Sequence, residues 1–157
     1  MRKTLLIVLL LIIGCSQETD VSYHDNGQKK SELIYKDKKL VKSTWWYENG
    51  QKKSEGTFKD GKRDGLRTYW DENGQKYREG NYKDGKEDGL YTEWYKNGQK
   101  RKEGFYRVGY FGEEGYSSNK TGKWTYWHEN GQKWREESHS SSAVYLEKGE
   151  GAQTGTW

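Results

Sequence analysis

Short runs of alternating apolar and polar residues, separated by glycine-containing turns, make up most of this chain. In residues 67–70, for example, threonine and tryptophan alternate with arginine and tyrosine, which is the period-two pattern of a β-strand. Asn73 and Gly74 then supply the positive φ angles of a tight turn. Residues 76–83 are predicted to return as the partner strand. The local unit is therefore a β-hairpin.

A second turn is predicted at residues 60–65, with the sequence Asp-Gly-Lys-Arg-Asp-Gly, and a close copy occupies residues 84–89. Strands joined only by short turns form an antiparallel meander. The absence of proline leaves every backbone donor free for pairing between strands.

The hairpin unit is repeated. Asn-Gly-Gln-Lys occurs five times, and its glycines are 23, 24, 24 and 33 residues apart, a period that indicates a repeat architecture. The turn residues are Asn26 and Gly27, Asn49 and Gly50, Asn73 and Gly74, Asn97 and Gly98, and Asn130 and Gly131. Four residues before each glycine stands Tyr23, Trp46, Trp70, Trp94 or Trp127, and five residues after it stands Glu32, Glu55, Glu79, Glu103 or Glu136. Eight residues after it stands Tyr35, Phe58, Tyr82 or Tyr106, but His139 in the fifth unit.

These patterns predict an all-β fold, an elongated antiparallel meander of tandem β-hairpin repeats. The tryptophan column should lie in a line on one face, and the favoured interpretation is that it forms the core. From residue 16 onward there are 24 aromatic residues but only ten Ile, Leu or Val, so the buried surface should consist mainly of aromatic rings. A disordered chain is excluded because its composition would be poor in aromatics.

The first fifteen residues have a separate character. A positive start is followed by nine apolar residues, 5–13, too few to span a bilayer and typical of a signal peptide. Residues 12–15, Ile-Ile-Gly-Cys, resemble the lipobox of bacterial lipoproteins, in which the cysteine is acylated and the preceding segment is removed. Cys15 is the only cysteine, which excludes an internal disulfide, and lipidation explains an unpaired thiol in an exported protein.

The repeat from Tyr23 to Tyr106 resembles the bacterial variant of the MORN repeat, and the segment WDENGQKYREGNYKDGKEDGL, residues 70–90, carries the resemblance most fully. The resemblance implies an elongated sheet with an interaction role. Members of this variant are often labelled antitoxins of the YwqK type. The predicted organisation is a signal peptide at 1–14, a lipidated cysteine with a short tether at 15–20, regular repeats at 21–106 and degenerate repeats at 107–157. Irregular loops are expected at 107–120 and 139–154, where a repeat protein often carries its specific function, although tolerated surface insertions are the equal alternative.

Catalytic and metal-binding groups are not recognisable. His24 and His128 share a repeat position but lie four units apart, so they are interpreted as exposed residues beside the turns rather than as metal ligands. Aspartates such as Asp60 and Asp64 occur among lysines, unlike a calcium-binding loop, and belong to turns. The glutamate column is repeated five times and is interpreted as a set of cross-strand charge partners. We expect no enzyme activity, no metal and no cofactor.

The charge pattern argues against a nucleic-acid partner. The formal charge of +4 includes Arg2 and Lys3 of the signal segment, and the remaining lysines and glutamates are interleaved rather than gathered into a basic stripe. The leading hypothesis is a non-catalytic protein-interaction scaffold in the bacterial cell envelope, held at the membrane through Cys15. Ser16 would favour the outer membrane if the cell is Gram-negative. The alternatives are an antitoxin or immunity protein that neutralises a toxin, and a glycan-binding or wall-binding module that uses the face with Trp46, Trp70, Trp94 and Trp127.

Overall fold

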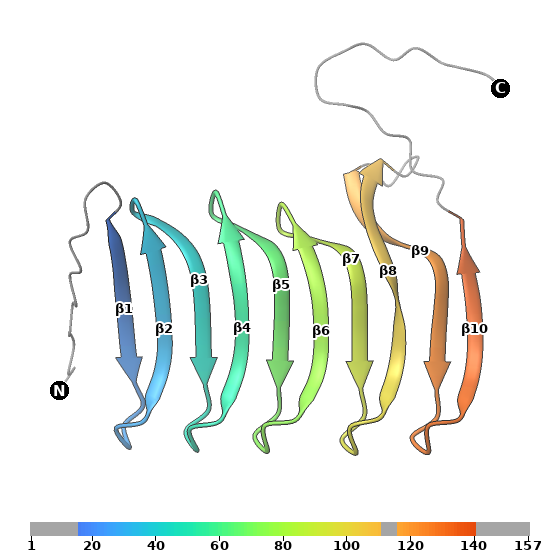
Figure 1. Ribbon diagram of the computed structural model, residues 1–157, viewed down its shortest axis with the longest axis horizontal. Helices are drawn as coiled ribbons and strands as arrows, with labels where there is room; N and C mark the ends of the chain where they lie inside the picture. Colours follow the sequence, from blue (N-terminus) through green and yellow to red (C-terminus); the bar gives the residue numbers. More distant parts are fainter. Residues whose placement is uncertain (1–15, 111–115, 141–157) are drawn as a thin grey trace, which may run out of the picture.

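The fold is a single open sheet of ten antiparallel strands in a computed structural model that describes residues 16–110 and 116–140. The spatial order of the strands is their order in the sequence, so each strand pairs with its neighbours along the chain (Figure 1). This confirms the predicted all-β meander of tandem hairpins. The strands are β1 (Gln17–Tyr23), β2 (Lys29–Lys36), β3 (Lys39–Trp46), β4 (Lys52–Lys59), β5 (Lys62–Trp70), β6 (Lys76–Lys83), β7 (Lys86–Trp94), β8 (Lys100–Tyr110), β9 (Tyr116–Trp127) and β10 (Lys133–His139).

The Asn-Gly loops lie in a row at one end of the strands. They are wider than the tight turn expected from the sequence. In the second unit, the Gly50 N–H donates to the Tyr47 carbonyl at 3.0 Å, and the Tyr47 N–H donates to the Gln51 carbonyl at 2.9 Å. Gly50 has a φ of 84°, whereas Asn49 is not among the residues with positive φ. The expectation of positive φ at both residues was therefore wrong. A turn closed by one left-handed glycine replaces it.

The turns at the other end of the strands are the tight ones. Asp60 and Gly61 have φ values of 48° and 78°, and both central residues of the turn between β6 and β7 also have positive φ. Two successive positive φ angles are those of a type I′ turn. The predicted turn over residues 60–65 was too long, because β5 already begins at Lys62. Gly65 lies inside β5 at an irregularity in the pairing with β4, and its φ of 97° explains why glycine occurs there.

The two faces of the sheet carry different side chains, because successive residues of a strand point to opposite sides. We call one the tryptophan face and the other the tyrosine face. The tryptophan face carries the column Trp46, Trp70, Trp94 and Trp127, and the tyrosine face carries Tyr69, Tyr82, Tyr91, Tyr106, Trp124 and Tyr126. The tryptophan column is in line, as predicted, but it is not an enclosed core. Its rings are half-buried, since no second layer packs on them among the described residues.

The tightest packing is on the tyrosine face, at its C-terminal half. Trp124 is fully buried, and its ring lies against Gly104 of the neighbouring strand. Tyr106 meets this indole edge to face, with ring centroids 5.0 Å apart, and Tyr91 lies 5.9 Å from the indole and 5.3 Å from Tyr106. Aromatic pairs in these arrangements stabilise beyond their buried area. The core therefore consists mainly of aromatic rings, as the composition predicted, but on the face opposite the tryptophan column.

The interruption before the fifth unit is mainly a longer hairpin. The expected irregular loop at 107–120 was wrong for most of its length, because β8 continues to Tyr110 and β9 starts at Tyr116. The extended hairpin rises beyond the neighbouring turns (Figure 1).

Most of the expected loop at 139–154 lies outside the described residues, as does Cys15. The expected tether at 15–20 is also corrected, since β1 begins at Gln17. Residues 16–110 and 116–140 contain no helix long and apolar enough to cross a lipid bilayer.

Candidate functional site

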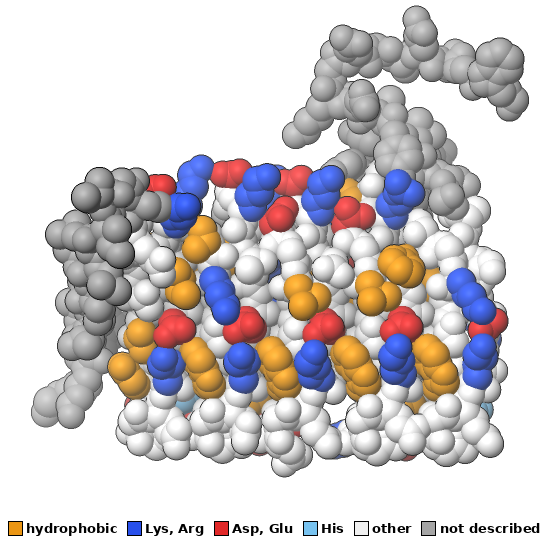
Figure 2. Space-filling view, in the orientation of Figure 1, with side chains coloured by type: hydrophobic (Ala, Val, Ile, Leu, Met, Phe, Trp, Pro, Cys, Tyr) orange, Lys and Arg blue, Asp and Glu red, His pale blue; other side chains and the backbone are white. Residues whose placement is uncertain are grey.

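A stripe of tryptophans, lysines and glutamates crosses the tryptophan face, parallel to the row of Asn-Gly loops. Figure 2 shows it as a row of alternating hydrophobic and basic side chains with a row of acidic ones beside it. Each of the five units contributes the lysine of its Asn-Gly-Gln-Lys segment and the glutamate three residues later, and every unit after the first also contributes a tryptophan. We call this set the tryptophan stripe: Trp46, Trp70, Trp94 and Trp127 with Lys29, Lys52, Lys76, Lys100 and Lys133 and with Glu32, Glu55, Glu79, Glu103 and Glu136.

Three lysines of the tryptophan stripe lie over the faces of indole rings. The Nζ atom of Lys52 lies 5.2 Å from the ring centre of Trp70, which belongs to the next unit, and Lys29 and Lys100 lie similarly over Trp46 and Trp127. Such contacts contribute about 0.5–1 kcal/mol at exposed positions. Sequence reasoning missed these lysines. Their occurrence at one position in all five turns was the signal that could have found them.

Each stripe lysine also forms an ion pair with the glutamate of its own strand. The five Nζ to carboxylate distances lie between 2.5 and 3.1 Å. Directly across the strand, however, the glutamate faces threonine: Thr68 donates to Glu79 at 2.9 Å. The glutamates were therefore wrongly expected to be mainly cross-strand charge partners. Only Glu55 and Glu136 also meet a lysine of an adjacent strand, Lys42 and Lys123 respectively.

The pKa of Glu55 shows how these contacts combine. Burial raises its pKa, but hydrogen bonds from Lys52 and Lys42 and their positive charges outweigh burial, so the pKa lies below its ordinary value. A carboxyl whose pKa is lowered by folding stabilises the folded state above its unfolded pKa, and this contribution is lost as the pH falls through the folded pKa. The lowered pKa keeps Glu55 ionised, and its ion pairs with Lys52 and Lys42 intact, at neutral pH.

Three of the Asn-Gly loops are joined to the loop of the next unit by their asparagine side chains. The Asn49 Oδ1 atom accepts from the Gln51 N–H at 3.0 Å, while its Nδ2 donates to the Glu72 carbonyl of the following loop at 2.6 Å. Asn26 and Asn97 repeat both contacts. Asparagine suits this position because it offers an acceptor and a donor on one short side chain. The recurrent Asn is thus explained by stacking between units.

Of the two histidines expected to be exposed beside the turns, His128 is exposed and His24 is not. The His24 side chain is only 12% exposed, and its Nε2 atom lies 3.0 Å from the Trp46 carbonyl. Tyr47 and Tyr95 make the corresponding bond in their units through a hydroxyl. His128 is exposed, as predicted, and its ring centre lies 5.9 Å from that of Trp134. His24 is therefore structural, and within residues 16–110 and 116–140 no three His, Cys, Asp or Glu side chains are grouped as metal ligands.

Two glycine substitutions should separate backbone strain from contact between units. Gly74 and Gly98 have nearly equal φ values, 79° and 82°. A Cβ atom on Gly74 would lie 2.7 Å from Oε1 of Gln51, whereas one on Gly98 would meet nothing within 4 Å. Both alanine variants should lose about 1 kcal/mol through strain, and Gly74→Ala should lose more. Urea unfolding of both proteins measures the difference. Equal losses would show that the Gln51 contact contributes nothing.

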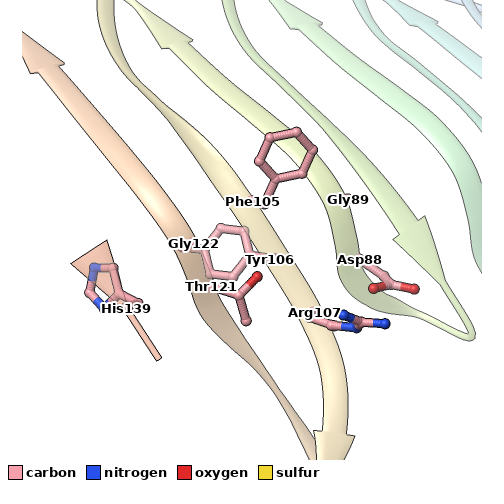
Figure 3. A pocket seen from close by; sticks show the side chains of 8 residues that line it. All are labelled: Asp88, Gly89, Phe105, Tyr106, Arg107, Thr121, Gly122 and His139. Carbon is pink, nitrogen blue, oxygen red and sulfur yellow. The ribbon is translucent and has the colours of Figure 1, made fainter. Parts of the chain in front are cut away.

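A concavity of about 460 Å³ lies among β7, β8, β9 and β10, close to the extended hairpin. Its lining residues are Asp88, Gly89, Phe105, Tyr106, Arg107, Thr121, Gly122 and His139 (Figure 3). The acid and the imidazole do not form a catalytic pair, because Asp88 accepts from the Val108 N–H at 3.3 Å and His139 lies 3.3 Å from Glu137. The arrangement could accept a small polar group but offers no activated nucleophile.

The tyrosine face carries a second set of charged and aromatic contacts. Arg78 lies between Tyr69 and Tyr91, 5.5 and 5.1 Å from their ring centres, and pairs with Glu87 at 2.5 Å. Burial is the main cause that raises the pKa of Tyr91 above its ordinary value. These side chains are packed against one another, and they stabilise the sheet rather than leaving an open row like the tryptophan stripe.

The fold and its surface define an open repeat scaffold, in which hairpin units stack through their loops and display a lysine and a glutamate five times and a tryptophan four times. The model of the MORN repeat variant family matches residues 21–37, 40–60, 63–84, 87–107 and 120–140. These matches cover more than half of the chain, so the protein belongs to the MORN repeat variant family. Repeats of this family are non-enzymatic modules that interact with proteins or membranes. No curated protein matches the chain.

Proposed function

We propose that this protein is a lipid-anchored component of the bacterial cell envelope whose sheet is a non-catalytic scaffold for a protein partner. The observation that carries the proposal is the tryptophan stripe, a regular row of half-buried indoles on a face that no second layer covers among the described residues. Tryptophan is enriched among the residues that dominate binding energy at protein interfaces. The anchor is proposed at Cys15, from its lipobox-like context.

The dimensions of the stripe suit an extended partner surface. Its tryptophans lie on β3, β5, β7 and β9, that is, on every second strand. Adjacent strands are about 4.8 Å apart, so the four rings span about 29 Å. The flanking ion pairs would form a polar rim around the aromatic centre, as is common in protein interfaces.

The lysines make the glycan-binding alternative less favourable. A sugar ring stacks on the flat face of an indole, but Lys29, Lys52 and Lys100 already lie over those faces. The remaining exposed part of each tryptophan is better suited to side chains of another protein. An antitoxin or immunity role is a special case of the proposed protein binding, with a toxin as the partner.

A pull-down with the acyl-free chain from residue 16 tests the proposal. The bait is offered separately to envelope proteins and to purified wall glycans of its own cell. We expect retention of one envelope protein, reduced at least tenfold in Trp70→Ala/Trp94→Ala, since loss of interface tryptophans costs 2 kcal/mol or more. Trp134→Ala is the matched control, because Trp134 is 58% exposed and contacts Tyr126 on the tyrosine face. Retention of glycan alone, or equal losses in both variants, would refute the proposal.

A further inference from the structure

The position of β1 fixes where a lipid on Cys15 would lie. The Ser16 carbonyl accepts a hydrogen bond from the Asp37 N–H at 3.1 Å, and Gln17 pairs with Lys36. Residues 36–39 form the turn between β2 and β3. Consecutive Cα atoms are about 3.8 Å apart, and residue 15 directly precedes Ser16, whose carbonyl is bonded to this turn. The anchor would therefore have almost no tether.

The row of tight turns, which lies nearest the anchor, differs in charge from the row of Asn-Gly loops at the other end of the strands. The three tight turns, residues 36–39, 59–62 and 83–86, contain seven lysines and three aspartates, a net charge of +4. The five Asn-Gly loops, residues 24–28, 47–51, 71–75, 95–99 and 128–132, contain five carboxylates and one lysine, a net charge of −4 with histidine neutral. All three tight turns lie at the end of the sheet at which strand β1 begins (Figure 1). The sheet is thus electrically polarised along its strands.

We infer that the sheet stands upright on the membrane, with its tight turns and their lysines against anionic lipid headgroups and the Asn-Gly loops directed away. The inference rests on the proposed anchor at Cys15. A tether of one residue holds the basic turns within the range of about 8–10 Å over which a charged surface acts at ordinary salt. Lysines close to an anionic bilayer each add attraction, and carboxylates are repelled.

This orientation leaves both faces accessible to a partner. The strands point away from the bilayer, so the tryptophan stripe, which runs beside the Asn-Gly loops, lies at the distal end of the sheet. Strands of eight residues rise about 3.3 Å per residue, which places the stripe about 20 Å above the headgroups. The extended β8–β9 hairpin rises on the membrane side and gives the sheet a second point of approach, far from the anchor (Figure 1).

Two matched cysteine labels test the orientation on the acylated protein, purified from membranes and reconstituted into vesicles. Lys62→Cys places a fluorophore at a tight turn and Lys96→Cys places one at an Asn-Gly loop. Both residues are exposed lysines, so each variant loses the same charge. Because Cys15 is the only native cysteine and its thiol would be acylated, the introduced thiol is the only one free. The vesicles contain phosphatidylglycerol and phosphatidylcholine at 3:7, with a quencher on the headgroups.

We expect at least threefold stronger quenching at position 62 than at position 96, and a smaller difference in pure phosphatidylcholine or at 0.5 M salt. Equal quenching, or stronger quenching at 96, with Cys15 shown to be acylated by mass spectrometry, would overturn the orientation alone. A preference that ignores lipid charge and salt would overturn the lysine contact. An unmodified Cys15 would overturn the anchor and this inference together.

Discussion

Replacing Gly104 by alanine should destabilise the sheet by about 2–3 kcal/mol, because a rigid aromatic contact would be overpacked. The added Cβ would overlap the indole of Trp124, which lies directly over Gly104 and is fully buried. Trp124 cannot move aside easily, because its Nε1 donates to the Phe105 carbonyl at 3.1 Å and its ring packs with those of Tyr91 and Tyr106. Overpacking a rigid aromatic contact costs more than crowding a flexible chain.

Gly56 provides the matched control for Gly104. It has the same place in its unit, but a Cβ there would meet Cγ of Arg67 at 3.1 Å, and the arginine can shift towards solvent. Gly56→Ala should therefore cost less than about 1 kcal/mol. Urea unfolding followed by tryptophan fluorescence measures both losses. Equal effects at the two glycines would show that Trp124 is not the centre of the packing.

Replacing Cys15 by serine should move the protein from the membrane fraction to the soluble fraction, a change of at least a hundredfold in the ratio of bound to free protein. Several acyl chains hold a protein firmly, because each buried methylene contributes about 0.8 kcal/mol. The serine variant keeps the size and polarity of the side chain but cannot form the thioether. Fractionation of cells after labelling with a radioactive fatty acid measures both the modification and the location.

Ser16→Ala is the control for this experiment, since it alters the adjacent residue and leaves the thiol and the Ser16 carbonyl in place. It should remain labelled and membrane-bound. If Cys15→Ser were still found in the membrane fraction, the anchor would not be at this residue, and the proposed location would have to rest on another contact.

The hairpin units could be predicted from the sequence because their signals are local. Alternation over residues 67–70 and the Asn-Gly spacing were enough to predict β6 at Lys76–Lys83 and the order of the strands. The turn geometries were less accessible, because Asp-Gly and Asn-Gly both allow a left-handed residue and the number of residues between strands decides the turn type. The register shift after Tyr69, for instance, widens the Asn-Gly loop and leaves Asn73 outside the positive-φ region.

The candidate site was only partly predictable, because burial depends on what lies above a face. A line of tryptophans was expected from the repeat, but a column of large aromatic residues resembles a core until the sheet is known to be single-layered. The lone Trp124, outside that column, is the residue that is fully buried. Glycine at position 104 creates the space for it, and one glycine among 20 in the sequence gave no separate signal. Contacts between units, such as His24 with Trp46, also require three-dimensional stacking.

Crosslinking in living cells tests the scaffold proposal most directly. A photoreactive amino acid replaces Lys76, in the tryptophan stripe, or the adjacent Tyr77, which packs against Tyr69 on the tyrosine face. We expect position 76 to capture one envelope protein in the membrane fraction, Trp70→Ala/Trp94→Ala to abolish this product, and position 77 to give little of it. Equal capture from both positions, or capture that persists without the tryptophans, would contradict the proposal that the tryptophan stripe binds a protein.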